Sequence, residues 1–297
     1  GGLYFMAMQH IEGVDLAWIL NDYAQSKELM PLEDVLRIIQ QVGAALDYVM
    51  DGDRELRAVE AALVAAEADP AHDGAVLADL HAAFEAIESG IQLIVIVTEN
   101  VPRQEVAQMV ELANLRGARI IGPNCLGLIT PGECKMGGIG GPAANTRQAY
   151  SRGPIGIMSR SGGMTTEIAS TLTAAGLGQS TAVSIGGDAI IGTSYAELMP
   201  YFEADPETQA IAIYSEPGGR MEAELAEWVT TNRSRLPIVA FMAGRFMDEM
   251  QGMRFGHAGT IVEGKEDTTA AKIERMEKAG ISVAERIEEI PKLIQKR

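Results

Sequence analysis

The sequence contains few cysteines, few histidines and no long apolar run. Its 297 residues include 2 Cys and 4 His, and aromatic side chains make up 5%. A transmembrane helix is not expected, since no stretch of about 18 apolar residues occurs. Basic residues number 24 against 41 acidic ones, and the net charge of −17 argues against nucleic acid and anionic membranes as partners. Cys125 and Cys134 lie in one Gly- and Pro-rich loop, where a disulfide is one alternative, but we favour free thiols in a reducing cytoplasm.

The acidic charge is concentrated toward the N-terminal end. Residues 1–90 carry 17 acidic and 4 basic side chains, whereas residues 91–297 carry 24 acidic and 20 basic ones. The first segment is rich in Ala, Leu, Asp and Glu, and the second in Gly, Ile and Thr. Such a shift marks parts of different character. We therefore expect a mainly helical segment over residues 1–85 and α/β structure over residues 86–150 and 151–297.

The C-terminal part alternates short apolar runs with helical stretches, which predicts an α/β fold. The predicted strands are 91–97, 118–121, 155–159, 180–185, 210–214, 238–242 and 281–283. The predicted helices are 103–116, 165–175, 195–203, 222–231, 268–279 and 287–295, and Gly117, Gly176 and Gly280 lie where C-caps are expected. The strands are apolar on both faces, as in a buried parallel sheet. From residue 151 this pattern indicates a flavodoxin-like parallel-sheet domain, preceded by a truncated Rossmann-like α/β unit.

The first 85 residues predict helices. Residues 32–49 carry an apolar stripe at helical spacing, formed by Val35, Leu36, Ile39, Val42 and Leu46. Residues 55–68 and 75–87 favour two more helices, separated by a break at Asp69-Pro70 and a turn at Asp73-Gly74. An isolated helix of this length is marginal in water. We therefore expect the segment to cover the sheet near residues 91–97, or to pack against a second copy of the chain as a homo-oligomer.

His257 is the residue that indicates chemistry most directly. It lies in the run Gly256-His257-Ala258-Gly259, whose glycines let other backbone approach the imidazole. Imidazole is a good relay nucleophile because its pKa lies close to working pH. Glu216, in a Ser-Glu-Pro-Gly-Gly turn, can accept a hydrogen bond from one ring nitrogen and fix the tautomer. The alternative is a structural histidine on a loop, and the spacing of His and Cys residues predicts no metal site.

Two Gly-rich loops upstream have the composition of anion sites. The run Ser159-Arg160-Ser161-Gly162-Gly163 follows a predicted strand and precedes a helix, so that N–H groups of the helix start can face an anion. The hydroxyls add donors, and the glycines leave room. The alternatives are an ordinary strand-to-helix turn here and a tight turn at Gly186-Gly187-Asp188. Together with His257 and Glu216, the loops predict a histidine that is phosphorylated during a reaction.

From about Ala86 to the C-terminus, the sequence resembles the α subunit of succinyl-CoA synthetase and its ADP-forming relatives. The motifs that carry the resemblance are G-P-N-C at 122–125, I-T-P-G-E-C-K at 129–135, the 159–163 loop, G-Q-S-T at 178–181, I-G-G-D at 185–188 and G-H-A-G at 256–259. The resemblance implies an acid–thiol ligase that interconverts acyl-CoA, phosphate and nucleoside diphosphate with acid, CoA and nucleoside triphosphate.

The same resemblance implies roles for individual residues. His257 would be the phosphohistidine and Glu216 its orienting carboxylate. By the resemblance, Ser159 and Ser161 would help bind phosphate, and from the composition of the two loops we add Arg160, Gly162 and Gly187 as phosphate-binding residues. The implied CoA or substrate loops contain Thr98, Glu99, Asn124 and Cys125. The sequence has no P-loop or ATP-grasp motif of its own, so Mg-nucleotide is expected to bind through a nucleotide-binding β partner.

The first 85 residues depart from that family. They contain no Gly-rich strand–turn–helix, which is the family's CoA-binding half, so we expect CoA binding to be weak or lost. Residues 1–50 resemble a protein-kinase fragment, through 4–13 and 32–49, but lack the catalytic motifs. Residues 51–85 resemble the helical arm of an ABC-type ATPase. The chain thus reads as a chimera, and the alternative to an enzyme subunit is a catalytically inactive structural protein.

Overall fold

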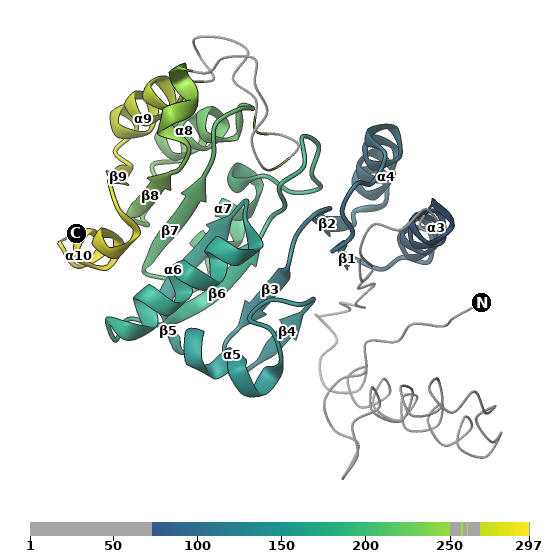
Figure 1. The fold of residues 1–297 in the computed structure, drawn as a ribbon, viewed down its shortest axis with the longest axis horizontal. Coiled ribbons are helices and arrows are strands. Elements are labelled where there is room, and N and C mark those ends of the chain that lie inside the picture. The colour runs from purple at the N-terminus through teal and green to yellow at the C-terminus, as the bar shows by residue number, and fades with distance from the viewer. Residues whose placement is uncertain (1–72, 250–256, 258–259, 261–267, 297) are drawn as a thin grey trace. The chain divides into compact units, whose positions relative to one another are not determined.

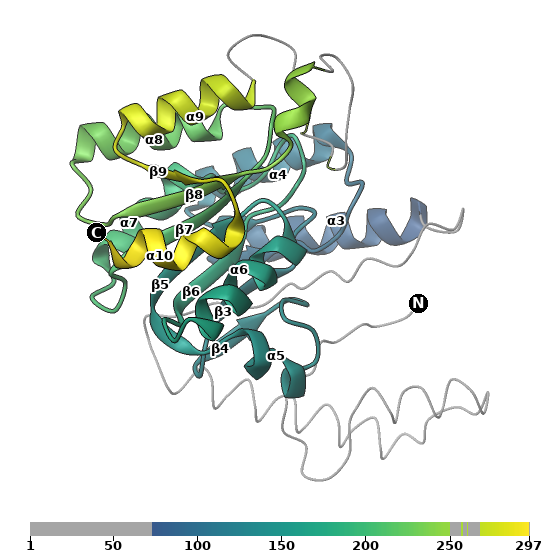
Figure 2. The same ribbon diagram turned by 60° about the vertical axis from the view of Figure 1, so that its left-hand side comes forward.

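The computed structural model describes residues 73–249, 257, 260 and 268–296. The chain divides into two units, Gly1–Ala58 and Val59–Arg297, and every described residue lies in the second. The predicted helices over 32–49 and 55–68, and the kinase-like and ATPase-like segments up to residue 72, therefore lie outside the described residues. Figures 1 and 2 show the described part from two directions.

A seven-stranded sheet forms the centre of this part, with the strand order β4-β3-β6-β5-β7-β8-β9 (Figure 1). The five strands from β6 to β9 in this order run parallel to one another. They are β5 (Arg152–Ser159), β6 (Gln179–Ser184), β7 (Ala210–Ser215), β8 (Ile238–Met242) and β9 (Ser282–Ala284). Each coincides with a predicted strand, apart from small shifts at the ends. The predicted flavodoxin-like α/β domain is therefore confirmed.

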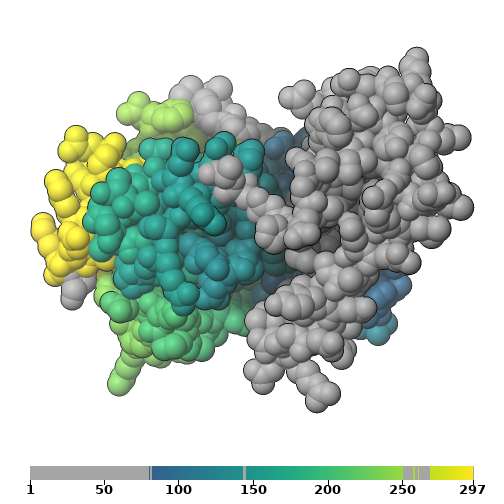
Figure 3. Space-filling view, turned by 90° about the horizontal axis from the view of Figure 1, so that it is seen from below, coloured from purple at the N-terminus to yellow at the C-terminus, as the bar shows by residue number. Residues whose placement is uncertain are grey.

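Helices cover both faces of the sheet (Figure 2). One face carries α6 (Gly162–Ala174) and α10 (Ile290–Gln295), with the 3-10 turn Ile287–Glu289 before α10 and α5 (Ala143–Ala149) against α6. The other carries α7 (Tyr195–Ala204), α8 (Met221–Asn232) and α9 (Thr269–Lys278). Successive strand residues alternate between the two cores: Ile211 packs with the α7–α9 side and Ala212 with the α6 side. Figure 3 shows the yellow C-terminal segment beside teal segments on the surface of this part.

An antiparallel hairpin at one edge of the sheet was not predicted. β3 (Gly127–Thr130) pairs with β4 (Cys134–Met136), and β3 also runs antiparallel to β6. Each strand has only three or four residues, and Pro131-Gly132 between them has the composition of a loop. The sheet is therefore mixed, not wholly parallel. The expected boundary after residue 150 falls between this hairpin and β5, although both belong to one sheet.

A separate two-stranded sheet pairs β1 (Leu93–Val95) with β2 (Arg119–Ile121) in parallel. It shares an apolar cluster with α3 (Asp73–Glu88) and α4 (Arg103–Arg116). As predicted, α4 ends at Gly117, whose φ of 71° is left-handed. α3 continues across the expected boundary at residue 85, and its residues Leu80 and Ala83 lie in this cluster. α3 thus packs on the small sheet, whereas the apolar stripe over residues 35–46, which we expect to cover it, lies outside the described residues.

Candidate active site

Three of the loops singled out from the sequence lie at one edge of the main sheet. β6, β5 and β7 are neighbours and run parallel, so their carboxyl ends meet at the same edge. The 159–163 loop begins at the end of β5, the 186–188 loop follows β6, and Glu216 follows β7. The N–H of Ile185 donates to the carbonyl of Ser159 at 2.8 Å and links two of these loops. The topology thus brings the phosphate-type loop, the Gly-Gly loop and the carboxylate together.

His257 contacts Glu216 through Nδ1. This atom lies 2.8 Å from Oε2 and 3.0 Å from Oε1 of the carboxylate. The side chain of Glu216 is 10% exposed and that of His257 is 29% exposed, so the pair is largely shielded from water. Thr260 supports it, because its hydroxyl donates to Glu216 Oε2 at 3.3 Å and its N–H donates to the His257 carbonyl at 3.0 Å. The two residues predicted to act together are therefore in contact.

The surroundings shift the pKa of both members of the pair. The hydrogen bond to Glu216 has the largest effect on His257 and raises the pKa of the imidazole, against the opposing effect of burial. The charge of Arg160 also lowers this pKa, and that of Asp188 raises it. For Glu216, burial is the largest single effect and raises the pKa, but the hydrogen bond and charge of His257, helped by Arg160, outweigh it. The pKa of Glu216 is therefore lowered, and the pair favours imidazolium and carboxylate.

Gly187 lies against the imidazole ring of His257. A Cβ atom at position 187 would lie 2.4 Å from Cδ2 and 2.9 Å from Nε2 of the ring, which is closer than real Cβ atoms approach. The neighbouring Gly186 has a φ of 108°, a conformation that side chains rarely adopt. The two glycines therefore have different tasks, because Gly186 makes the turn and Gly187 admits the ring.

The 159–163 loop is stabilised by its own serine side chains. Ser159 Oγ donates to the Ser161 carbonyl at 2.7 Å and accepts from the Ser161 N–H at 3.1 Å. Ser161 is the N-cap of α6, and its Oγ accepts from the Met164 N–H at 3.4 Å. Gly162 packs tightly on Leu126, since a Cβ at 162 would lie 2.2 Å from Leu126 Cγ. The serines and Gly162 thus hold the start of α6 in place at the site edge.

Arg160 is turned inward toward the Gly-Gly loop. Its Nη2 donates to the carbonyls of Gly187 at 3.0 Å and Asp188 at 2.9 Å. The residue is 1% exposed, and its Nε has no hydrogen-bond partner among the residues that the structure describes. Arg160 therefore supports the backbone that contacts the histidine ring, and its charge reaches the His257–Glu216 pair from the interior.

The predicted CoA or substrate loops meet the Gly-Gly loop at Asn124. The Asn124 carbonyl accepts from the Gly187 N–H at 3.0 Å, and its side-chain amide donates to Asp188 Oδ1 at 2.9 Å. The backbone N–H of Asn124 donates to the Thr98 carbonyl at 2.9 Å. Thr98 is buried and Glu99 is exposed. Asn124 thus links the Thr98 loop to the backbone beside the histidine.

Both cysteines are free thiols, as we expected. Cys125 is buried and Cys134 is exposed. The Cys125 thiol donates to the Ile96 carbonyl at 3.2 Å. Burial raises the pKa of Cys125 to about 12, against a smaller opposing effect of a hydrogen bond from the Gly127 backbone. The thiol is therefore protonated at neutral pH and is not a nucleophile there.

Three buried polar side chains behind Glu216 were not singled out from the sequence. The ammonium of Lys272, on α9, donates to Glu222 Oε2 at 2.6 Å, to the Glu216 carbonyl at 3.1 Å and to the Gly218 carbonyl. The Ser215 hydroxyl donates to the other carboxylate oxygen of Glu222. The sequence signal that could have identified Lys272 and Glu222 is their helical spacing, which puts both on the buried faces of their helices.

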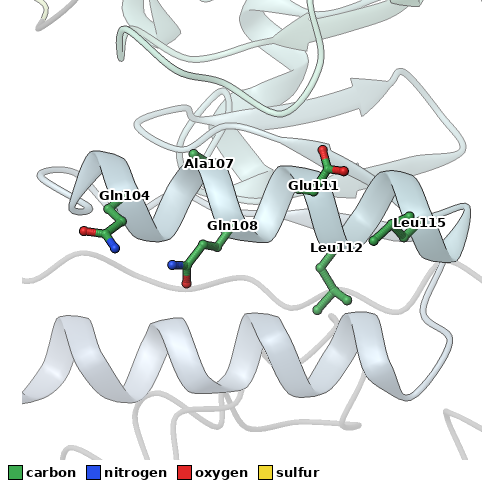
Figure 4. A pocket seen from close by; sticks show the side chains of 6 residues that line it. All are labelled: Gln104, Ala107, Gln108, Glu111, Leu112 and Leu115. Atoms are coloured by element: carbon green, nitrogen blue, oxygen red, sulfur yellow. The ribbon is translucent and has the colours of Figure 1, made fainter.

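An apolar recess on the surface of α4 involves none of these residues (Figure 4). It is lined by Gln104, Ala107, Gln108, Glu111, Leu112 and Leu115. Within the described ranges, no group of three or more His, Cys, Asp or Glu side chains could hold a metal ion. In the same ranges, no helix has both the length and the apolar character needed to cross a membrane.

Known proteins share the sequence of the part of the chain that carries the histidine site. Residues 152–295 match the family described as the succinyl-CoA ligase like flavodoxin domain. The chain is 42% identical over 217 residues to the ADP-forming succinate–CoA ligase subunit alpha of Aquifex aeolicus, covering 72% of this chain and 68% of the relative. It is 41% identical over 214 residues to the ADP-forming sulfoacetate-CoA ligase subunit SauD of Bilophila wadsworthia, covering 72% and 71%. The chain therefore belongs to the family of α-type subunits of ADP-forming acyl-CoA ligases.

Solved structures share the fold. ATP citrate lyase from Methanosaeta concilii, in complex with (3S)-citryl-CoA, aligns with a TM-score of 0.68 at 26% identity. The alignment covers 73% of this chain but only 36% of that longer chain. The dinucleotide forming acetyl-coenzyme A synthetase 1 of Ca. Korarchaeum cryptofilum aligns over 80% of this chain and 47% of its own, with a TM-score of 0.57. At 21% identity, this second likeness concerns the fold alone.

Proposed function

We propose that this chain is the α-type subunit of an ADP-forming acid–thiol ligase in which His257 carries a phosphoryl group. The observation that carries the proposal is the 2.8 Å contact between His257 Nδ1 and the shielded carboxylate of Glu216. A carboxylate at one ring nitrogen keeps the proton on that nitrogen and leaves the other, Nε2, with a free lone pair in the neutral ring. The relatives named as succinate–CoA and sulfoacetate-CoA ligase subunits support the same reaction class.

The transfer chemistry follows from this arrangement. In the direction from ATP, the Nε2 lone pair forms a bond to the γ-phosphorus while the bond from that phosphorus to the β-phosphate oxygen breaks, and ADP leaves. The substituted ring keeps its Nδ1 proton and carries positive charge, which the Glu216 carboxylate stabilises at contact distance. Transfer of the phosphoryl group to an oxygen of ADP breaks the nitrogen–phosphorus bond and restores the neutral imidazole. The pair thus serves both directions of the transfer.

The phosphoryl group needs a cradle beside the ring, and the start of α6 supplies the chemistry for one. The first N–H groups of a helix have no partners within it and carry partial positive charge, which favours anions. The charge of Arg160 adds to this potential, since it acts on both His257 and Glu216. We assign phosphate binding to Ser159, Arg160, Ser161, Gly162 and Gly187.

CoA and a partner subunit complete the proposed enzyme. The relatives are named as CoA ligase subunits, which implies a partner subunit, and we assign Mg-nucleotide binding to a β-type partner. We place the CoA or substrate side of the site at Thr98, Glu99, Asn124 and Cys125. The ATP citrate lyase of similar fold is in complex with the CoA thioester (3S)-citryl-CoA, which supports CoA as a ligand of this fold. Because residues 1–85 contain no Gly-rich strand–turn–helix, CoA is expected to bind weakly.

The proposed division of the chain has three parts. Residues 151–297 form the flavodoxin-like ligase domain, to which the hairpin β3-β4 adds two strands. Residues 86–150 are the remnant of a CoA-binding Rossmann-like domain, covered by α3. Residues 1–85 are the mosaic segment that ends within α3. The two free thiols support a reducing cytoplasm as the place where the chain works.

The direct test is phosphorylation of the chain. The full chain is mixed with the β subunit of an ADP-forming succinate–CoA ligase and γ-labelled ATP, and acid-labile label on the chain is measured. We expect His257→Asn to abolish the label, because the proposed acceptor is the ring that the Glu216 carboxylate holds at Nδ1. The matched control is His81→Asn, a histidine of α3, which should leave the label unchanged.

Two outcomes would contradict the proposal. Label that survives His257→Asn would place the phosphoryl group elsewhere. An unlabelled wild-type chain, beside a β subunit that labels its own α subunit normally, would support the alternative of an inactive mosaic that retains the ligase fold.

A further inference from the structure

We propose that Lys272 is a positioning residue for the histidine site, acting through the backbone on both sides of Glu216. The inference rests on the proposed function of His257. The Lys272 ammonium has three donors, and each has an acceptor: the carbonyls of Glu216 and Gly218, and Glu222 Oε2 at 2.6 Å. Two of these acceptors belong to the short turn that presents the orienting carboxylate to the ring.

The Lys272–Glu222 pair is fully buried, since both side chains are 1% exposed. Removing two charges from water costs several kcal/mol per ion, and a well-packed apolar pair of similar volume is often equally stable or more so. Stability alone therefore does not account for an ion pair at this place. The hydrogen bonds of the pair give a second reason for its presence, because a buried network in which every polar group has a partner specifies one backbone arrangement.

The network anchors residues 215–218 to two helices at once. Ser215 donates its hydroxyl to Glu222, which lies on α8, and Lys272 reaches the next carbonyls from α9. The Cα of Glu216 therefore lies between two anchored positions, and its carboxylate extends from there to His257. Productive geometry at such a site has to be held within about 0.5 Å.

The helix that carries Lys272 is itself fixed at its start. The Asp248 carboxylate accepts from the N–H of Thr269 at 2.7 Å, from the Thr269 hydroxyl at 2.7 Å and from the N–H of Ala270 at 3.1 Å. A carboxylate at a helix N-terminus stabilises that end of the helix. Lys272 thus extends from a fixed first turn of α9.

The test uses Lys272→Met in the full chain, which keeps the length of the side chain and removes its charge and donors. The titration of His257 is followed by NMR on the histidine-labelled chain, without nucleotide, with His257→Asn to assign the signal. The charged groups that face this ring are Glu216, Arg160 and Asp188. If Glu216 is no longer held in place, the raised pKa of His257 falls toward 6.5. The rate of His257 phosphorylation should fall about 10-fold, which corresponds to a loss of about 1.4 kcal/mol from the hydrogen bond between the ring and Glu216.

The matched control is Lys278→Met on the same helix. Lys278 is 74% exposed and pairs only with Glu274 among the contacts that the structure describes, at 2.6 Å. This variant should leave both the His257 titration and the phosphorylation rate unchanged. A purely structural role for Lys272 would lower the thermal midpoint without moving the His257 titration in the folded protein.

A folded Lys272→Met chain with a wild-type His257 titration would overturn the inference. If that variant does not fold, Ser215→Ala is tested instead, because it removes one hydrogen bond to Glu222. A smaller fall in the pKa of His257 supports the inference, and an unchanged pKa overturns it. Failure of the proposed function is distinguishable, because the titration needs no phosphorylation. Label that persists in His257→Asn would refute the phosphohistidine, whatever Lys272→Met does to the ring.

Discussion

Gly187→Ala should disable the histidine site by steric contact alone. The added Cβ would lie 2.4 Å from Cδ2 of His257, whereas ordinary contacts begin at 3.4 Å, so the ring has to move by about 1 Å. The backbone of Gly187 is not in the left-handed region, so alanine brings no conformational strain of its own. The substitution therefore isolates the position of the ring from the stability of the loop.

The size of the effect follows from the contact that is lost. A shift of about 1 Å away from the glycine changes the 2.8 Å Nδ1–Oε2 distance enough to break a normal hydrogen bond. A hydrogen bond to a charged group contributes about 1.5–3 kcal/mol, and the partial exposure of the ring favours the lower end of that range. About 1.4 kcal/mol corresponds to tenfold in rate. We therefore expect His257 phosphorylation to slow by at least about 10-fold.

The assay compares phosphorylation rates of Gly187→Ala and Gly138→Ala with the wild-type chain. Gly138 is the matched control because it lies outside the site loops, and an added Cβ there would meet nothing within 4 Å. The control should phosphorylate like the wild type. Equal rates for Gly187→Ala and wild type, in a folded chain, would refute the described packing of ring on glycine.

Other predictions follow from the same contacts. The His257–Glu216 pair should stabilise the fold most between about pH 4.5 and 6.5: its contribution is lost as pH rises through the raised pKa of His257 and as it falls through the lowered pKa of Glu216. The difference in thermal midpoint between wild type and His257→Asn should therefore peak in that window, and a pH-independent difference would contradict the ion pair. Alkylation at pH 8 should modify the exposed Cys134 and spare the buried Cys125, as read by peptide mass spectrometry, and rapid loss of both thiols would show that Cys125 is accessible. Calorimetry should detect weak CoA binding at most, and a low-micromolar dissociation constant would mean that the Thr98–Asn124 side of the site suffices without a Gly-rich half.

The parts of the fold that the sequence predicted are those with a long local signal. β8 is a run of five apolar residues, and α4 ends at a glycine, so the predicted and observed bounds of both agree. The β3-β4 hairpin was not predicted because its strands are three or four residues long, and it joins the sheet only where β3 pairs with β6, some fifty residues away along the chain. Short strands held by distant partners leave no periodic pattern.

In the candidate site, too, the features with a local sequence signal were predicted, and those set by distant contacts were not. His257 and Glu216 stand out by composition, as a rare histidine between glycines and a carboxylate in a tight turn. Which ring nitrogen faces the carboxylate depends on tertiary placement, as does the inward turn of Arg160 toward carbonyls 27 and 28 residues ahead. Lys272 was missed because a helical lysine normally faces solvent, yet it lies on the buried face of α9.

The central claim is tested most directly by identifying the phosphorylated atom. The chain is phosphorylated with its β-type partner and ATP, and ³¹P NMR and peptide mass spectrometry then locate the phosphoryl group. Because Nδ1 of His257 is held by Glu216, we expect phosphorus on Nε2 of His257 and nowhere else in the chain. A phosphoryl group on Nδ1, on a serine of the 159–163 loop or on another histidine would contradict the account.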